Sequence, residues 1–153
     1  MQSTPVIQIL KFFKSILLLL MSCIILAACS KPDEITPEQQ VTQYLTGLGN
    51  RYWQIKELYV NNVKTVLTTS QLSYYKTYTI SATGEQYSGS FSDANGFAGN
   101  WILKGKDHIM ETITNTVNGS VPLDITINAI DTNNMDVQYT SNGQTVRTVY
   151  FAY

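Results

Sequence analysis

Apolar and polar residues alternate along the second half of the chain, and this period of two predicts β-strands. The alternation is most regular in two segments, with Leu123, Ile125, Ile127 and Ala129 against Asp124, Thr126 and Asn128, and Met135, Val137 and Tyr139 against Asp136, Gln138 and Thr140. Strands of this kind have one face in a core and one in water. From Tyr52 onward the other segments are rich in Tyr, Thr, Val and Ile, which also favours strands.

Turn residues separate these segments at short intervals. They are Asn61-Asn62, Thr83-Gly84, Asp93-Ala94-Asn95-Gly96, Lys104-Gly105, Asn118-Gly119, Asn133-Asn134 and Asn142-Gly143. The runs between them make about eight strands at a spacing of roughly 8 to 12 residues, which is typical of a sandwich or a barrel. Because short connections pair strands that are neighbours in sequence, we expect an all-β fold, an antiparallel up-and-down β-barrel.

One short helix is expected before the strands. Thr36-Pro37-Glu38-Gln39 has a capping residue, a proline at the first helical position and a glutamine that completes a capping box, and Gly47 and Gly49 end the run. The apolar residues of this segment fall on one face, and they are Val41, Tyr44, Leu45 and Leu48. A helix this short must pack on the barrel to be stable.

The N-terminal segment has the order of a signal peptide. Lys11 and Lys14 precede an apolar stretch from Ile16 to Leu26, and the small residues Ala27 and Ala28 follow. The uncharged run 15–28 has 14 residues, whereas a bilayer-spanning helix needs about 20. We therefore expect residues 1–28 to be a signal peptide rather than a permanent transmembrane anchor.

The sequence Leu26-Ala27-Ala28-Cys29 resembles the lipobox of bacterial lipoproteins. The resemblance implies cleavage before Cys29, diacylglycerol on its thiol and an acyl chain such as palmitate on the freed amine, so that the partner is a membrane. Residues 29–35 then form a lipidated cysteine and a polar tether. Ser30 after the cysteine implies sorting to the outer membrane of a Gram-negative cell envelope. Asp33-Glu34 fits either a surface-export signal or an ordinary tether.

Cleavage changes the composition of the mature chain. Removing 28 of the 153 residues leaves 125, a usual size for one domain, here residues 36–153 behind the tether. Cys23 is removed and Cys29 is lipidated, so no disulfide, thiolate nucleophile or zinc-cysteine site is expected. Two of the ten basic residues leave and all eleven acidic ones stay, so the net charge changes from −1 to −3. Such a chain does not attract nucleic acid, and we expect a monomer.

Five short segments carry a family resemblance, and they are Tyr52-Trp53-Gln54-Ile55-Lys56, Lys76-Thr77-Tyr78-Thr79-Ile80, Ala82-Thr83-Gly84, Gly99-Asn100-Trp101-Ile102-Leu103-Lys104-Gly105 and Thr148-Val149-Tyr150-Phe151. Through these segments the chain from Leu45 to Tyr153 resembles the small lipocalin-like domains of exported bacterial lipoproteins. The resemblance implies a barrel that binds a small, mostly apolar molecule. It also implies that Trp53 plugs the closed end and that Arg147 stacks across it, a structural contact. Arg51 stands where lipocalins have glycine, which is a departure.

Catalytic and metal-binding patterns are sparse in the sequence. His108 follows a turn, and we find no phosphate loop, nucleophile elbow or paired histidines, so no enzyme, cofactor or metal is expected. An enzyme would need two or more of Glu57, Glu85, Glu111, Asp124 and His108 to converge in one cleft. Asp131, Asn133, Asn134 and Asp136 could offer oxygen ligands to calcium, but turn residues of this kind are commonly structural.

Two charges stand on otherwise apolar faces of predicted strands. A period of two puts Lys76 with Tyr74, Tyr78 and Ile80, and Glu111 with Ile109, Ile113 and Val117, so both charges would point inward. A charge inside a barrel is costly unless it is paired or wetted. The pattern therefore indicates an internal ion pair or a hydrated cavity that meets a polar group of a ligand. The alternative is a different facing or register, or strands at an open rim.

Aromatic residues are numerous in the predicted strands and can line an apolar pocket. The candidate ligand-binding residues are Lys76, Tyr78, Tyr87, Phe91, Glu111 and Tyr139. A binding barrel predicts a cavity of a few hundred Å3. The other hypothesis is an envelope structural or interaction protein, an assembly subunit or an inhibitor, with a barrel filled by its own side chains and an exposed apolar patch.

Overall fold

Antiparallel strands dominate the computed structural model, which describes residues 34–47, 49–81, 87–117 and 119–153. Among these residues there are nine strands and two helices: α2 (Pro37–Thr46), β1 (Asn50–Val60), β2 (Val63–Thr65), α3 (Thr69–Leu72), β3 (Tyr75–Ile80), β4 (Ser88–Asp93), β5 (Ala98–Lys104), β6 (His108–Ile113), β7 (Val121–Ile130), β8 (Asn134–Ser141) and β9 (Gln144–Ala152). The predicted signal peptide, Cys29 and most of the tether lie outside the described residues. In the part of the chain that the structure describes, no helix is long and apolar enough to span a bilayer.

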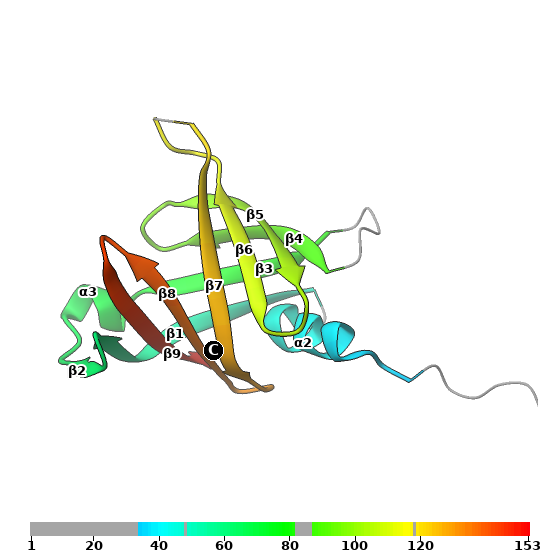
Figure 1. Cartoon of the computed structure of the whole chain (residues 1–153), viewed down its shortest axis with the longest axis horizontal. Helices are drawn as coiled ribbons and strands as arrows, with labels where there is room; N and C mark the ends of the chain where they lie inside the picture. Colours follow the sequence, from blue (N-terminus) through cyan, green and yellow to red (C-terminus); the bar gives the residue numbers. More distant parts are fainter. Residues whose placement is uncertain (1–33, 48, 82–86, 118) are drawn as a thin grey trace, which may run out of the picture. The chain divides into compact units, whose positions relative to one another are not determined.

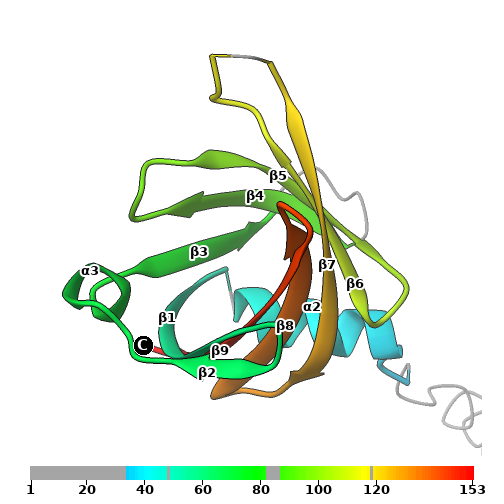
Figure 2. The ribbon, with the colours of Figure 1, turned by 60° about the vertical axis from the view of Figure 1, so that its left-hand side comes forward.

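The strands form a closed antiparallel barrel, as expected (Figure 1). Each strand pairs with its sequence neighbour from β3 to β9, β1 pairs with β3, and β1 also pairs with β9. Because β2 pairs only with β1, eight of the nine strands form the closed ring. The expected up-and-down barrel is therefore confirmed, and the pairing of β1 with β9 shows in addition that the barrel is closed. Figures 1 and 2 show α2 and α3 at opposite ends of this barrel.

Helix α2 begins and ends where the sequence predicts. The Thr36 side chain accepts from the Gln39 backbone N–H, the Gln39 side chain accepts from the Thr36 N–H, and Gly47 with a φ of 63° follows the last turn. The helix buries Leu45, whose carbonyl accepts a 2.9 Å hydrogen bond from the indole nitrogen of Trp53. The helix and this tryptophan thereby close one end of the barrel.

Two-residue hairpins connect several strands with the turn chemistry that their residues favour. Asn61 and Asn62 have φ values of 50° and 65°, and Asn142 and Gly143 have values of 50° and 74°, so both turns place two residues in the left-handed region. The turns predicted at 83–84 and 118 lie outside the described residues. Tight turns of this type match the twist of the flanking strands, which fixes the pairing of neighbours.

Two β-bulges change which residues face inward. One lies between Ile55 and Glu57 in β1, and the other between Ile127 and Ala129 in β7. Because a bulge inserts one residue, the inward face moves to Leu58 after the first bulge and to Ile130 after the second. The expectation that Ala129 shares the buried face is therefore wrong, and this residue is exposed.

The densest part of the core lies near α2. Leu45, Trp53, Trp101, Ile109 and Met135 are each at most 1% exposed and pack in this half of the barrel. Toward the α3 end the inward residues of the strands include Val60, Val137 and Val146, and a cavity lies among them.

Candidate ligand site inside the barrel

A cavity of about 610 Å3 occupies the half of the barrel next to α3. Its walls are mainly aliphatic and aromatic, and they include Ile55, Leu58, Val60, Phe91, Ile113, Leu123, Ile125, Val137 and Val146. Its rim contains exposed residues of α3 and of the loops after β4 and β8, among them Ser70, Asn95, Phe97 and Ser141, so the cavity opens to solvent there. Both the volume and the lining are those of small-molecule sites.

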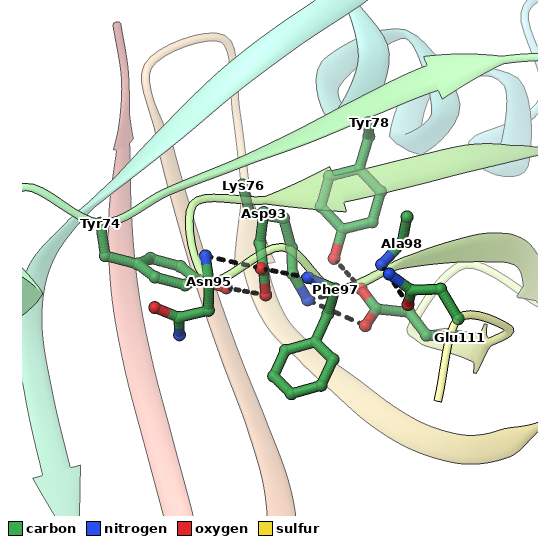
Figure 3. A network of polar contacts seen from close by, with 9 residues as sticks. Tyr74, Lys76, Tyr78, Asp93, Asn95, Phe97, Ala98 and Glu111 are labelled. Carbon is green, nitrogen blue, oxygen red and sulfur yellow. Dashed lines mark hydrogen bonds and ion pairs between the residues drawn. The ribbon is translucent and has the colours of Figure 1, made fainter. Parts of the chain in front are cut away.

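An ion pair crosses the interior of this cavity. The Lys76 Nζ of β3 lies 2.9 Å from Oε1 and 2.8 Å from Oε2 of Glu111 in β6, and the two residues are 8% and 1% exposed (Figure 3). Strands β4 and β5 separate β3 from β6 in the sheet, so the contact spans the lumen rather than two adjacent strands. Both charges point inward as predicted, and the alternative of a rim position is wrong.

Aromatic residues complete the surroundings of the pair. Tyr78 donates its hydroxyl hydrogen bond to Oε1 of Glu111, and the Lys76 Nζ lies 5.0 Å from the centroid of the Phe91 ring. Burial, and then the nearby Glu111 carboxylate, raise the pKa of Tyr78 well above its ordinary value. This phenol is therefore a neutral hydrogen-bond donor throughout the physiological pH range.

A second polar contact lies beside the first on the same wall. Asp93 stands opposite Lys76 in the β3–β4 ladder, and its Oδ2 accepts a 3.0 Å hydrogen bond from the hydroxyl of Tyr74. Its Oδ1 accepts from the backbone N–H groups of Asn95 at 2.9 Å and Phe97 at 3.0 Å. The aspartate thus holds the loop at the cavity rim and also faces the interior.

The opposite wall contributes hydroxyl groups from β8 and β9. Tyr139, Thr148 and Tyr150 line the cavity, and burial raises the pKa of both tyrosines. The hydroxyl of Tyr139 forms no hydrogen bond with any residue that the structure describes. That hydroxyl is therefore open to a bound molecule.

Five of the six predicted binding residues lie together in the cavity: Lys76, Tyr78, Phe91, Glu111 and Tyr139. Tyr87 does not. It precedes β4 with a φ of 68°, and its hydroxyl lies 3.2 Å from Oγ1 of Thr36 at the start of α2. Sequence analysis put it on a strand face, whereas the structure places it in a turn, where it packs against the core and does not line the cavity.

Several cavity residues with polar side chains were missing from the predicted set, among them Tyr74, Asp93, Thr148 and Tyr150. Tyr74 shares the period of Lys76, and Thr148 and Tyr150 alternate in the closing strand, so their facing could have been found from periodicity. The inward direction of Asp93 could not have been found in this way, because the sequence places this residue in a predicted turn.

The predicted contact between Arg147 and Trp53 is wrong. Arg147 belongs to the outward face of β9, pairs with Asp136 at 2.9 Å and lies 4.9 Å from the ring centroid of Tyr59, its partner in the β1–β9 ladder. The cation over Trp53 is Arg51, at 5.7 Å from the ring centroid. Arg51 occupies the place where the sequence departs from the lipocalin pattern.

The described residues considered for catalysis lie in three places. Nδ1 of His108 lies 3.4 Å from Oδ1 of Asp124 on the outer face, Glu57 pairs with Lys64 at 2.7 Å on the outer face, and Glu111 is in the lumen. Glu85 lies outside the described residues. The absence of enzymatic activity stays a prediction.

The acidic cluster after β7 is a turn. Oδ1 of Asp131 accepts from the backbone N–H groups of Asn133 at 2.6 Å and Asn134 at 2.8 Å. These bonds, the one from Asn133 first, lower the pKa of Asp131. Within the described ranges no three acidic, histidine or cysteine residues are grouped to hold a metal ion. Asp131 therefore has the turn role that the structural interpretation expects, and the absence of a metal stays a prediction.

Fold and site together define a class of protein, a closed antiparallel β-barrel with an internal cavity. Comparison with known proteins adds no narrower group: no family model matches the chain, and neither a curated protein nor a solved structure matches it. Function must therefore be argued from the cavity itself.

Proposed function

We propose that this protein is a membrane-anchored lipoprotein whose lipocalin-like barrel binds a small, mostly apolar molecule. The observation that carries the proposal is the cavity of about 610 Å3, which has mainly apolar walls, a few polar groups at one level and one open end. A barrel of this size can be filled by its own side chains. Here aliphatic residues leave the space open, and that supports a binding role over a purely structural one.

The expected gain from binding follows from the apolar walls. A ligand that buries roughly 300 Å2 of apolar surface gains about 7 kcal/mol of hydrophobic free energy. Part of this gain is offset by the loss of translational and rotational freedom, which costs at least about 4 kcal/mol. Shape and apolar contact alone thus give weak binding, and the polar groups of the cavity decide which molecule is held.

Native mass spectrometry tests the binding role. The barrel and its core lie within the compact unit Ile35–Tyr153, so the soluble domain from Lys31 onward is incubated with a lipid extract of the source bacterium. We expect a retained small molecule of defined mass. A bare domain before and after incubation would contradict the proposal and favour the envelope interaction protein.

A pair of variants shows whether the molecule occupies the cavity. Leu123 lines the cavity and Asp124, its neighbour in β7, is exposed on the outer face. Leu123→Trp adds a large side chain to the lumen and is expected to abolish retention, whereas Asp124→Trp adds the same group outside and is expected to preserve it. Equal retention by both variants would place the ligand elsewhere.

The anchor is a separate part of the proposal and rests on the sequence at Leu26-Ala27-Ala28-Cys29. It puts the protein in the envelope of a Gram-negative bacterium, at the outer membrane, with acyl chains on Cys29. Mass spectrometry of the mature N-terminus should find a lipid-modified cysteine. Cys29→Ser should leave a precursor of unchanged length, and normal processing of that variant would refute lipidation.

A further inference from the structure

The polar groups inside the cavity include Lys76, Tyr78, Asp93 and Glu111. Most of their hydrogen-bond donors are already engaged, whereas their carboxylates keep free acceptor positions. Lys76 directs two of its three N–H groups to Glu111, and its ammonium faces the Phe91 ring. Tyr78 donates to Oε1 of the same carboxylate. A carboxylate offers roughly four lone-pair positions, so Glu111 retains an acceptor position on Oε2.

The carboxylate of Asp93 also keeps a free acceptor position. Asp93 accepts two backbone N–H groups at Oδ1 and the hydroxyl of Tyr74 at Oδ2, which leaves a further acceptor position at Oδ2. The donor that faces it, Tyr74, is already engaged. A ligand head group that donates hydrogen bonds can therefore be satisfied here, while one that only accepts finds few donors.

The net charge of the cavity lining favours the same kind of head group as its free hydrogen-bond acceptors. Among the described residues of the lining there is one cation, Lys76, and there are two carboxylates, Asp93 and Glu111, which sum to a net charge of −1. The lining tyrosines add no charge, because burial raises the pKa values of Tyr74 and Tyr78. A positive head group thus meets a favourable potential and a negative one an unfavourable potential.

A carboxylate ligand would also disrupt the existing pair. Lys76 is the one cation that the described part of the chain contributes to the lining, and its ammonium is bound to both oxygens of Glu111. An incoming carboxylate would either displace Glu111, which is 1% exposed, or share the one ammonium with it, so that two carboxylates lie beside a single cation. An uncompensated buried carboxylate would remain, and that outcome is strongly unfavourable.

We propose that the cavity selects apolar molecules with a hydrogen-bond-donating head group, a protonated primary amine before a hydroxyl, and rejects carboxylates of the same chain length. The head group lies between Asp93 and Glu111, and the chain extends along the valine and isoleucine walls. The hydroxyl of Tyr139 faces the same space and can accept from the head group. This inference rests on the proposed binding function and specifies its ligand class.

Three probes of equal chain length test the selection: dodecylamine, dodecanol and dodecanoate, titrated into the soluble domain from Lys31 onward by calorimetry at pH 7. We expect the amine to bind tightest and the carboxylate at least about tenfold more weakly. The selection would be overturned if the three probes bound equally or if dodecanoate bound tighter than the amine. The binding function would stand in that case, provided that Leu123→Trp loses all binding. No binding of any probe would overturn both.

A charge-matched pair of variants tests the cause of the selection. Asp93→Asn keeps the Oδ1 acceptor for the loop and removes one negative charge from the cavity, so the affinity ratio of amine to carboxylate should fall several-fold. Asp124→Asn makes the same charge change on the outer face and should leave the ratio unaltered. An unchanged ratio in Asp93→Asn would contradict the assignment of the head group to this carboxylate.

Discussion

The ion pair inside the barrel gives the sharpest test of the structure. In Lys76→Met a chain of similar length remains, but Glu111, 1% exposed, loses the cation bound to both of its oxygens. Breaking a buried pair by removing one partner costs about 3 to 5 kcal/mol. Total stability of a domain is about 5 to 15 kcal/mol. The substitution is therefore expected to remove a large fraction of the free energy of unfolding.

A double variant separates the lost pair from the lost packing. In Lys76→Met with Glu111→Gln both charges of the pair are absent, and the amide oxygen still accepts from the hydroxyl of Tyr78. The uncompensated charge causes most of the cost, so the double variant should recover most of the stability that the single variant loses. Recovery shows that the effect arises from the charge and not from the volume of the side chain.

The assay is urea unfolding of the soluble domain at pH 7, followed by the fluorescence of the two buried tryptophans. Lys56→Met, at an exposed position of β1, is the control and should unfold like the wild type. The reasoning is refuted if Lys76→Met lies within about 1 kcal/mol of the wild type, since a change that small is typical of surface sites. A single variant and a double variant of equal stability would refute it as well.

Three further predictions concern stability. Tyr78→Phe removes a hydrogen bond to a charged acceptor and should lower the free energy of unfolding by about 1.5 to 3 kcal/mol in the same assay. The hydrogen bond from Arg147 lowers the pKa of Asp136, so the stabilisation by this pair is present at neutral pH and is lost as the pH falls from about 4 through the lowered folded-state pKa. Arg147→Met should therefore have a lower urea midpoint than the wild type at pH 7. A difference in midpoint that persisted at pH 2 would contradict this. Gly99→Ala would put a Cβ 1.9 Å from a backbone oxygen across the sheet and should cost more than about 3 kcal/mol, whereas Gly49→Ala, with nothing within 4 Å of the added group, should unfold like the wild type.

Periodicity predicted the facing of side chains well wherever the strands are regular. Lys76 and Glu111 point inward as the period of two requires, because alternate residues of a strand lie on the same face of the sheet. The same reasoning failed at Ala129, since a β-bulge adds one residue and reverses the facing beyond it. A bulge of this kind has no distinct residue pattern in the strand, so it could not be read from the sequence.

Contacts between residues far apart in the chain could not be predicted from local sequence patterns. The inward direction of Arg147 was expected from a resemblance, but closure of β1 on β9 puts it outside, opposite Tyr59, and gives Trp53 a cation from Arg51 instead. Tyr87 was assigned to the cavity because aromatic residues favour strands, yet it occupies a turn. Strand pairing decided the contact of Arg147, and the turn before β4 decided that of Tyr87.

The sequence by itself determined the strands, the tight turns, the capping of α2 and the presence of two inward charges, because each depends on residues close together in the chain. Tertiary structure alone decided that these charges meet across the lumen, since β3 and β6 become opposite walls only when the sheet closes. It also decided that the barrel is hollow at one end. A cavity depends on the sum of side-chain volumes from many strands, and no short stretch of sequence contains that sum.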